Sequence, residues 1–282
     1  MRKILSFGLL ALLLTHCAGP GPTVSERSNR YDPHVLNQVS DFIRTQDPKK
    51  GKAVVVFDLD DTLFDARSRT LPILRELSLE NDFKATYPQA AARLSAATLN
   101  DMRYDVRNIL KGLGLDDEAL VKRVTDYWLA KFFSSRCEND EPLAGAADLV
   151  NQYAKLGATV VYLSGRDTPR MGTCSEKSLK KRGFPFGKKT RLVLKPDGKM
   201  DDLAFKRQAM ETIEKLGQVI AVFENEPRNL NALGEHFPKA VLVFIDTQHS
   251  SAPDSPTAEA HWVKDFIPGP PPEAAPAVDE SK

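Results

Sequence analysis

The sequence lacks an excess of charge of either sign. Its 282 residues carry 39 Lys and Arg against 38 Asp and Glu, which gives a formal net charge of +1. Binding to nucleic acid or to an anionic membrane through overall charge needs a clear basic excess. The balance therefore gives no reason to expect either partner. The length and the 41% hydrophobic content are ordinary for a globular protein with one large or two modest domains.

The apolar run near the N-terminus is too short to span a bilayer. It covers residues 4–14, whereas a transmembrane helix needs about 20 apolar residues. Arg2 and Lys3 precede the run, and no Asp or Glu occurs before Cys17. This pattern is typical of a signal peptide. We predict that residues 1–16 are a signal and that the rest of the chain is exported.

Residues 14–17, Leu-Thr-His-Cys, resemble the lipobox of bacterial lipoproteins, in which the chain is cut before a cysteine that is then acylated. His16 departs from the small residue of that pattern. The resemblance implies a lipid anchor through Cys17 on the periplasmic or surface side of a bacterial membrane. A secretory signal cut slightly later, which would leave a soluble periplasmic or secreted protein, and an uncleaved anchor remain as alternatives. Residues 17–30 have the Gly, Pro, Ser and charge content of a flexible tether.

Cysteine is scarce, with 3 in the whole chain. Besides Cys17, only Cys137 and Cys174 are present. In an oxidising compartment these two could form a disulfide, but two cysteines do not establish a bridge from sequence alone. Two free buried thiols fit the sequence equally well.

Apolar runs of strand length alternate with helical patterns through most of the chain. The runs lie at 53–57, 158–163, 219–223 and 240–245, with a weaker one at 191–194. Helical patterns lie at 35–43, 146–156, 175–182, 202–216 and 229–236. Val- and Ile-rich runs separated by helices that end in Gly indicate a parallel sheet covered on both faces. We therefore expect a doubly wound α/β core over residues 31–65 and 141–267.

Residues 66–140 interrupt this alternation. They contain no convincing strand and at least two long helical patterns, so we expect a helical insertion between the first two strands. Its aromatic stripe is interpreted as packing in preference to a substrate platform, and consists of Tyr127, Trp128, Phe132 and Phe133. Residues 268–282 have the composition of a disordered tail.

Polar side chains follow three of the predicted strands directly. The first strand is followed by Asp58, Asp60 and Asp61, the second by Ser164-Gly165-Arg166, and a later one by Glu224-Asn225-Glu226. In an open parallel sheet, ligands bind beyond the carboxyl ends of the strands. These groups are therefore expected to meet in one site.

The three stretches resemble motifs of the haloacid dehalogenase-like hydrolase superfamily. VVVFDLDDTLFD is similar to its first motif, VVYLSGRD to its second and VFENEPRNL to its fourth, in the family's order and over roughly residues 50–250. The resemblance implies a Rossmann-like core, and the helical insertion matches the family's C1-type cap. It also implies that Ser164 binds the substrate phosphate beside Gly165 and Arg166. A surface ion pair is the alternative for Arg166.

The first motif makes chemical sense for phosphate transfer. The Asp58 carboxylate would attack phosphorus and form an aspartyl-phosphate, and Asp60 would donate and then accept a proton. A Mg²⁺ ion would offset the repulsion between carboxylate and phosphate. The resemblance implies that Asp58, the backbone carbonyl of Asp60, and Glu224 bind the metal. Asp61 and Asp65 are assigned to the turn that follows.

Two lysines are candidates for the cation that the family places beside the nucleophile. Lys206, near the start of a predicted helix, fits the family position best, and Lys195 is the alternative. The fourth motif departs from the family pattern, because Glu224 replaces an Asp and neutral Asn225 or Asn229 replaces a later Asp. This departure puts the strength of metal binding in doubt.

We therefore predict an exported, Mg²⁺-dependent phosphatase that hydrolyses small-molecule phosphomonoesters and has no nucleic-acid partner. An Asp at position 60 favours phosphatase over dehalogenase chemistry, because the resemblance implies that dehalogenases lack it. Two alternatives remain open. One is a nucleic-acid end phosphatase, and the other is a binding lipoprotein of the same fold with weak catalysis.

Overall fold

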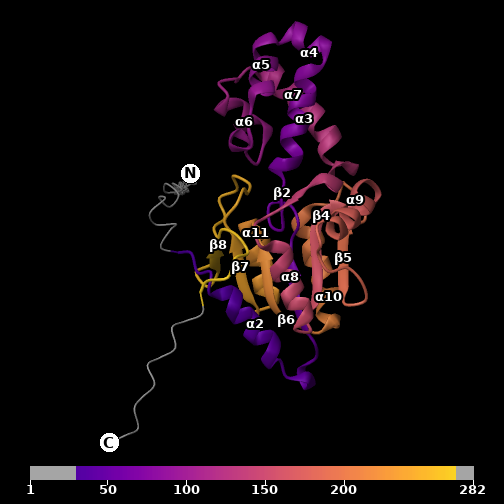
Figure 1. Ribbon diagram of the computed structural model, residues 1–282, viewed down its shortest axis with the longest axis vertical. Helices are drawn as coiled ribbons and strands as arrows, with labels where there is room; N and C mark the ends of the chain where they lie inside the picture. The colour runs from indigo at the N-terminus through magenta and orange to yellow at the C-terminus, as the bar shows by residue number, and fades with distance from the viewer. Residues whose placement is uncertain (1–29, 271–282) are drawn as a thin grey trace, which may run out of the picture.

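The computed structural model describes residues 30–270 and contains the predicted parallel sheet (Figure 1). Six strands lie in the order β5-β4-β1-β6-β7-β8, and every neighbouring pair is parallel. The strands are β1 (Ala53–Phe57), β4 (Thr159–Asp167), β5 (Thr190–Lys195), β6 (Gln218–Glu224), β7 (Val241–Ile245) and β8 (His261–Val263). The chain starts in the middle of the sheet and builds outward in both directions. The doubly wound α/β prediction is confirmed.

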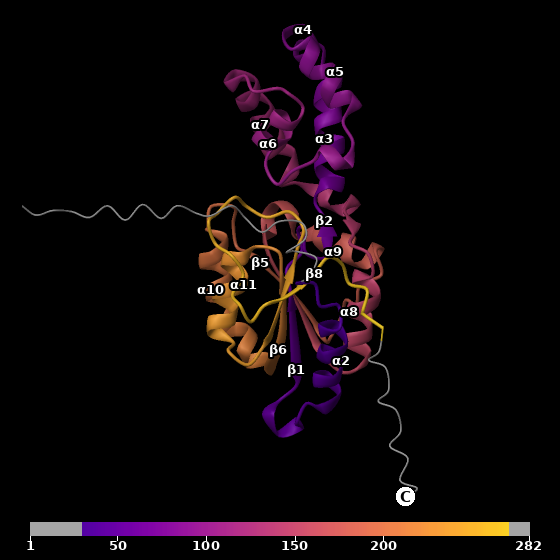
Figure 2. The same cartoon turned by 90° about the vertical axis from the view of Figure 1, so that its left-hand side faces the viewer.

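Helices cover both faces of the sheet because the side chains of its central strand alternate between two cores. Ala53, Val55 and Phe57 of β1 pack with α2 (Val35–Thr45), α8 (Ala146–Lys155) and α9 (Thr168–Lys181). Val54 and Val56 pack with α10 (Asp202–Ile213) and α11 (Pro227–His236). Figure 2 shows α10 and α11 on one side of the sheet and α2 and α8 on the other. Burial on both faces explains the unbroken apolar runs in the sequence.

Two elements differ from the sequence prediction. Helix α9 begins at Thr168 and not near 175, because the Asp167 side chain accepts the Arg170 backbone N–H and Pro169 occupies the first turn. The edge strand β8 was not predicted, since three residues are too short for a recognisable pattern. Short 3₁₀ helices complete the core at Pro48–Lys50 and Glu214–Leu216.

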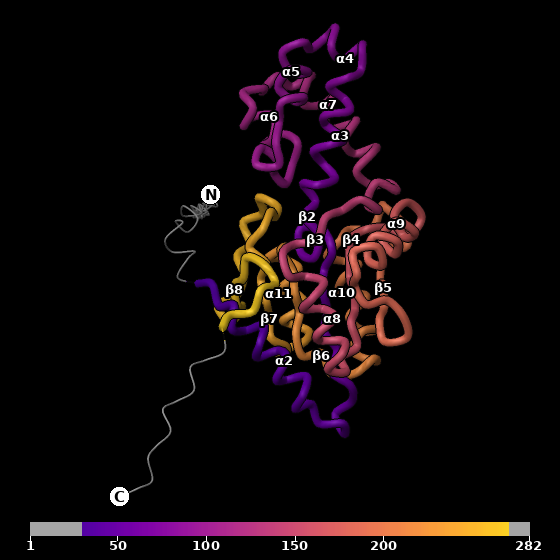
Figure 3. Tube along the Cα trace, in the orientation of Figure 1, coloured from indigo at the N-terminus to yellow at the C-terminus, as the bar shows by residue number. Residues whose placement is uncertain are grey.

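The helical insertion stands above the carboxyl ends of the strands (Figure 1). It contains α3 (Arg67–Leu79), α4 (Asn81–Thr86), α5 (Pro88–Ala96), the 3₁₀ turn Leu99–Asp101, α6 (Val106–Gly112) and α7 (Glu118–Phe132). All five α-helices contribute to an apolar core separate from those of the sheet. At its base, β2 (Phe64–Asp65) pairs antiparallel with β3 (Glu141–Pro142), so the outgoing and returning segments lie side by side (Figure 3). The insertion therefore has its own core and two adjacent connections to the sheet.

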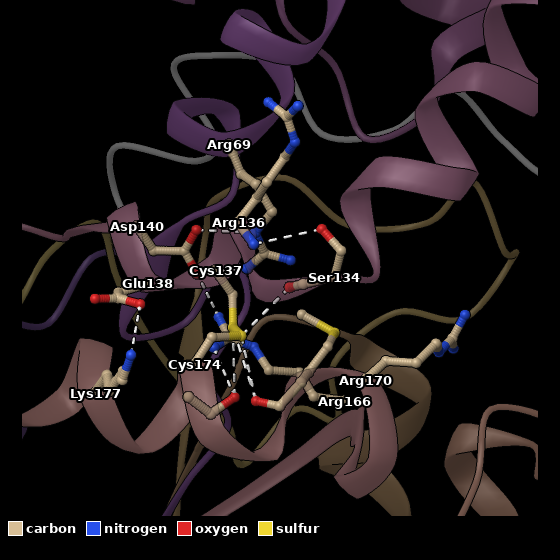
Figure 4. Close-up of a disulfide and its surroundings, with 12 residues drawn as sticks. Arg69, Ser134, Arg136, Cys137, Glu138, Asp140, Arg166, Arg170, Cys174 and Lys177 are labelled. Atoms are coloured by element: carbon tan, nitrogen blue, oxygen red, sulfur yellow. Dashed lines mark hydrogen bonds and ion pairs between the residues drawn. A yellow bond between two sulfur atoms is a disulfide. The ribbon is translucent and has the colours of Figure 1, made fainter.

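A disulfide joins Cys137 to Cys174, with the two Cα atoms 5.6 Å apart (Figure 4). Cys137 lies in the 3₁₀ helix Ser135–Asn139 on the returning segment, and Cys174 lies in α9. Of the two possibilities left open by the sequence, the structure has the pair. The bond attaches the base of the insertion to the helix that follows the second predicted motif.

The predicted signal, lipobox cysteine and tether fall at residues 1–30 and lie almost wholly outside the described part of the chain. Within residues 30–270, no helix combines the length and the apolar character that crossing a membrane requires. The predicted disordered tail begins inside the described residues. There, Gly269 donates its N–H to Pro33 and accepts a hydrogen bond from the Asn37 side chain.

Candidate active site

The parallel pairing of β1 with β6 places Asp58 and Glu224 side by side. Phe57 pairs with Phe223, and the Asp58 N–H donates to the Phe223 carbonyl at 3.0 Å. Both acids directly follow buried strand residues and are themselves buried, with 7% and 1% of their surface exposed. Two carboxylates in such a place repel each other and lose hydration, so a cation is needed between them.

Lys206 supplies that cation from α10. Its Nζ donates to Asp58 Oδ1 at 2.7 Å and to Glu224 Oε2 at 2.5 Å. Burial would lower the lysine pKa, but the charges of Asp58 and Glu224 outweigh it and raise the pKa above its usual value. For Asp58, burial is the largest influence, and its pKa lies well above the usual range despite Lys206. Of the two candidate lysines, Lys206 is therefore the one beside the expected nucleophile.

Lys195 lies at another edge of the same cavity. Its Nζ donates to Asp202 Oδ1 at 2.5 Å and to the Met200 carbonyl at 3.1 Å. The Asp202 carboxylate lies against Gly165, which leaves room for it because it has no side chain. A Cβ at Gly165 would lie 2.3 Å from Asp202 Oδ2. Lys195 thus ties the end of β5 to the start of α10.

Glu224 uses both carboxylate oxygens within the protein. While Oε2 accepts from Lys206, Oε1 accepts the backbone N–H groups of Asn225 and Glu226 at 3.1 and 3.0 Å. Burial raises its pKa, and Lys206 partly opposes this effect. Glu has one methylene more than Asp, and this extra length allows the carboxylate to accept the N–H groups of the two residues that follow it. The residue is consequently a support for the fourth motif as well as a candidate metal ligand.

Asp60 is held by two arginines and not by a lysine. Arg166 Nε and Nη2 donate to its two oxygens at 2.9 and 2.7 Å, and Arg69 Nη2 donates to Oδ1 at 2.5 Å. Although burial raises the pKa of Asp60, the two guanidinium groups hold it well below its usual value. The carboxylate remains 28% exposed and lines the cavity.

The second predicted motif contributes Ser164 and Arg166 to the lining of the cavity. Ser164 is 1% exposed, lines the cavity and accepts the Arg166 backbone N–H at 3.3 Å. The Arg166 side chain is fully buried and contacts Asp60, Asp140 and Ser175. The alternative of a surface ion pair for Arg166 is wrong. Its guanidinium binds these protein partners, and its role toward a substrate phosphate stays a prediction.

Asp61 lies in the turn after β1, as expected, whereas Asp65 lies in the short strand β2 that follows it. Asp61 has a positive φ of 56°, a conformation that Asp tolerates better than most residues, and its side chain accepts the Ala66 N–H. Burial and the neighbouring Asp60 raise the Asp61 pKa to about 8. Asp65 forms a two-pronged ion pair with Arg67 at the start of α3.

A cavity of about 220 Å³ lies between the strand ends and the insertion. The core contributes the acids, Ser164 and Lys206, and the insertion contributes Trp128, Phe132 and Phe133 of the aromatic stripe. Trp128 and Phe132 stack with ring centroids 4.3 Å apart. These rings therefore pack, as interpreted from the sequence, and also form an apolar wall of the cavity.

Oxygen atoms that suit Mg²⁺ line the same cavity. Asn229 Oδ1 is buried and has no hydrogen-bond partner, and Asn229 lines the cavity together with Asp58 and Glu224. Such an unpaired oxygen is costly unless a ligand satisfies it. Hard oxygen donors of this kind fit Mg²⁺, although among residues 30–270 no group of three or more acidic, His or Cys side chains could hold a metal. The donor chemistry fits the ion, with the Asn229 amide oxygen available in addition to the two carboxylates.

Sequence reasoning missed Arg69 and Asp140. Asp140 is completely buried and binds both Arg69 and Arg166. The two missed residues are separated by 71 positions, and neither belongs to a recognisable motif. The pairing of β2 with β3 places the segments that carry them side by side.

Comparisons with known proteins find solved structures of similar fold, with low sequence identity and low TM-scores. No family model matches the chain, and no curated protein matches it. A class C acid phosphatase from Bacillus anthracis with tungstate bound is 14% identical, covers 79% of each chain and has a TM-score of 0.43. A hydrolase of the haloacid dehalogenase-like family from Streptococcus pneumoniae is 12% identical over 71% of this chain and 88% of its own, with a TM-score of 0.42. A dehalogenase is 15% identical over 77% and 94%, with a TM-score of 0.43. Because these identities are below 25% and these TM-scores below 0.5, none of these structures establishes what this chain binds or does.

Proposed function

We propose that this protein is a Mg²⁺-dependent phosphatase that hydrolyses small phosphomonoesters through a phosphorylated Asp58. The observation that carries the proposal is the Asp58–Lys206 pair at the end of β1. Asp60 and Ser164 line the same cavity. A buried carboxylate paired with a lysine is suited to meet a phosphate, because the cation reduces the repulsion between the two anions. That repulsion is about 4 kcal/mol per charge pair at 4 Å and an effective dielectric constant of 20.

The reaction would run in two steps. In the first, an Asp58 oxygen bonds to phosphorus and the bond to the leaving oxygen breaks. Asp60 donates a proton to that oxygen, and it must first take up this proton against Arg69 and Arg166, which favour its ionised form. In the second, Asp60 takes a proton from a water molecule whose oxygen bonds to phosphorus. The bond between phosphorus and Asp58 then breaks, which releases inorganic phosphate and restores both acids.

Mg²⁺, when bound, would supply positive charge that offsets the repulsion between Asp58 and the phosphate. Asp58, the backbone carbonyl of Asp60, Glu224 and Asn229 would hold it. The remaining work falls to the chain itself. Lys206 holds Asp58 in place, and Ser164 offers a hydroxyl to the phosphate oxygens.

The shape and lining of the cavity support a small substrate with an apolar or flat leaving group. Its volume of about 220 Å³ lies below the usual range of pockets for drug-sized ligands. Trp128, Phe132 and Phe133 supply aromatic rings to the cavity lining, and aromatic faces bind flat groups well.

An assay on 4-nitrophenyl phosphate, with and without Mg²⁺, tests the proposal directly. The full-length protein should turn over only with Mg²⁺, and Asp58→Asn should lose at least about 1,000-fold in kcat, since a missing nucleophile is rarely replaced. Asp41→Asn is the matched control, because Asp41 is exposed on α2 and pairs with Arg44 on the same helix. Equal activity of Asp58→Asn and Asp41→Asn would contradict the mechanism. Faster hydrolysis of a 3′-phosphorylated oligonucleotide than of a mononucleotide would instead favour an end phosphatase.

Glu224 favours a second candidate, a binding protein with weak catalysis. Both of its carboxylate oxygens already accept hydrogen bonds from Lys206 and the backbone, which weakens it as a metal ligand. If Mg²⁺ up to millimolar concentrations produces neither turnover nor thermal stabilisation, this second candidate replaces the phosphatase.

Export and a lipid anchor through Cys17 are part of the proposal and rest on the N-terminal sequence alone. Metabolic labelling with a fatty acid should mark the wild-type chain and not Cys17→Ser. Label that persists in Cys17→Ser would refute the anchor. A chain that is exported without label would be either a soluble secreted protein or one anchored by its uncleaved signal.

A further inference from the structure

Asp140 is a buried acid that the proposed reaction does not use. None of its surface is exposed. Its Oδ1 accepts Arg69 Nε at 2.8 Å, and its Oδ2 accepts Arg69 Nη2 at 2.5 Å and Arg166 Nη2 at 2.7 Å. A buried carboxylate with three charge-assisted hydrogen bonds is a fixed part of its surroundings.

The two arginines share the same pair of acids. The Nη2 atoms of Arg69 and Arg166 each contact Asp60 Oδ1, at 2.5 and 2.7 Å, and each also contact Asp140 Oδ2. Two guanidinium groups this close repel each other. The arrangement holds because two carboxylates lie between them, so that two positive and two negative charges balance. If either acid is removed, the repulsion between the two guanidinium groups is no longer balanced, and one arginine is expected to move away.

This cluster also joins the insertion to the core. Arg69 lies in the first turn of α3 and Asp140 directly precedes β3, so both belong to segments that connect the insertion to the sheet. Asp60 lies shortly after β1 and Arg166 lies near the end of β4, so both belong to the core. The Ser175 hydroxyl accepts from Arg166 Nη1 at 3.1 Å and lies 3.7 Å from Cys137 Sγ. Arg166 therefore lies near the Cys137–Cys174 disulfide (Figure 4). The base of the insertion is therefore tied to the carboxylate that faces the cavity.

We propose that Asp140 is a positioning residue that orients the Asp60 carboxylate toward the leaving oxygen by fixing Arg69 and Arg166. The proposal rests on the phosphatase function above, because it takes Asp60 as the proton donor of that reaction. It predicts a defect confined to the departure of the leaving group. A purely structural role for Asp140 would instead affect all substrates alike.

The test compares two leaving groups in Asp140→Asn. Glycerol phosphate releases an alcohol that needs a proton, whereas 4-nitrophenyl phosphate releases a stable anion. We expect kcat/KM for glycerol phosphate to fall about 10- to 100-fold, the range expected for a misplaced acid, and that for 4-nitrophenyl phosphate to fall less than about threefold. The inhibition constant of inorganic phosphate should stay within about twofold, since phosphate binding does not need the proton.

Glu141→Gln is the matched control, because Glu141 is the next residue and pairs with Arg182 at the exposed surface. It should leave both substrates unchanged. If Asp140→Asn does not fold, Ser175→Ala decides, since it removes the neutral acceptor of Arg166 Nη1 and leaves the charges of the cluster unchanged. We then expect the ratio of the two kcat/KM values to shift in the same direction by at least about threefold.

Each outcome separates the two proposals. A wild-type protein that hydrolyses neither ester overturns the phosphatase function and the role of Asp140 with it. An active wild type with an unchanged ratio in folded Asp140→Asn, or in Ser175→Ala, overturns the role of Asp140 alone. A shifted ratio with unchanged phosphate inhibition supports both.

Discussion

The Lys206 ammonium lies 2.7 Å from the Asp58 carboxylate, and both side chains are buried. The same ammonium also binds Glu224, so one positive charge serves two acids. Buried ion pairs add little net stability, but removal of one partner is costly because the other charge is left uncompensated. Lys206 is therefore expected to matter for folding as well as for catalysis.

Replacement of Lys206 by Met should lower the free energy of unfolding by about 3–5 kcal/mol near neutral pH, because Asp58 and Glu224 remain buried without their cation. Urea unfolding without added metal measures this. Lys195→Met is the control, because its partner Asp202 has a half-exposed side chain, and it should cost about 1 kcal/mol or less. Equal losses in the two variants would show that the contact with Asp58 and Glu224 is not what stabilises this region.

Glu76 should make the free energy of unfolding depend on pH in the acidic range. Hydrogen bonds from Lys131, and then from Arg136 and Tyr127, lower its pKa from 4.5 to about 2. A carboxylate with a lowered pKa stabilises the folded state above its ordinary pKa, and this contribution is lost as the pH falls from about 4.5 to about 2. The group is 40% exposed, so solvent screening limits the gain to about 0.5–1 kcal/mol.

Glu76→Gln should therefore be less stable than wild type at pH 6, and the difference should vanish near pH 2. Thermal unfolding across this range measures it. Asp126→Asn on α7 provides the control, because Asp126 pairs with Lys122 in an exposed ion pair. A difference that stays constant down to pH 2 would contradict the assignment.

The disulfide between Cys137 and Cys174 closes a loop across 37 positions. A loop of that length restricts the unfolded chain enough to stabilise the protein by about 3–4 kcal/mol in the chain-entropy model. Reductant should lower the unfolding midpoint of the wild type and leave that of the Cys137→Ser, Cys174→Ser double variant unchanged. A wild type insensitive to reductant, with thiols shown to be reduced, would mean that the bond adds no stability.

Much of the fold was predictable because a buried parallel sheet has a simple sequence pattern. The central strands are buried on both faces, so they read as unbroken apolar runs, and ligand-facing residues follow them at the carboxyl edge. This pattern predicts that Asp58 and Glu224 lie in one region, and the neighbouring strands β1 and β6 bring them there. Their chemical roles remain predictions.

Arg69 and Asp140 could not be predicted in the same way. Their contact depends on how the insertion returns to the sheet, and a two-residue strand such as β3 has no periodic pattern. An isolated Arg and an isolated Asp in sequence look like solvated surface residues, which most of them are. The disulfide was undecided for a related reason, because the number of cysteines carries no information on distance.

Asn229 gives the sharpest test of metal binding. Its unpaired Oδ1 lies in the cavity with Asp58 and Glu224, and a carboxylate there would bind a cation more strongly than an amide does. Asn229→Asp should lower the Mg²⁺ concentration for half-maximal thermal stabilisation by about tenfold, because binding to the folded state raises the melting temperature. Asn231→Asp adds the same charge to α11 at a side chain that binds Ser255 and Thr257, away from the cavity lining, and should leave the Mg²⁺ response unchanged. If both variants respond to Mg²⁺ as the wild type does, then Asn229 does not contact the ion, and the metal, if bound, relies on Asp58 and its neighbours alone.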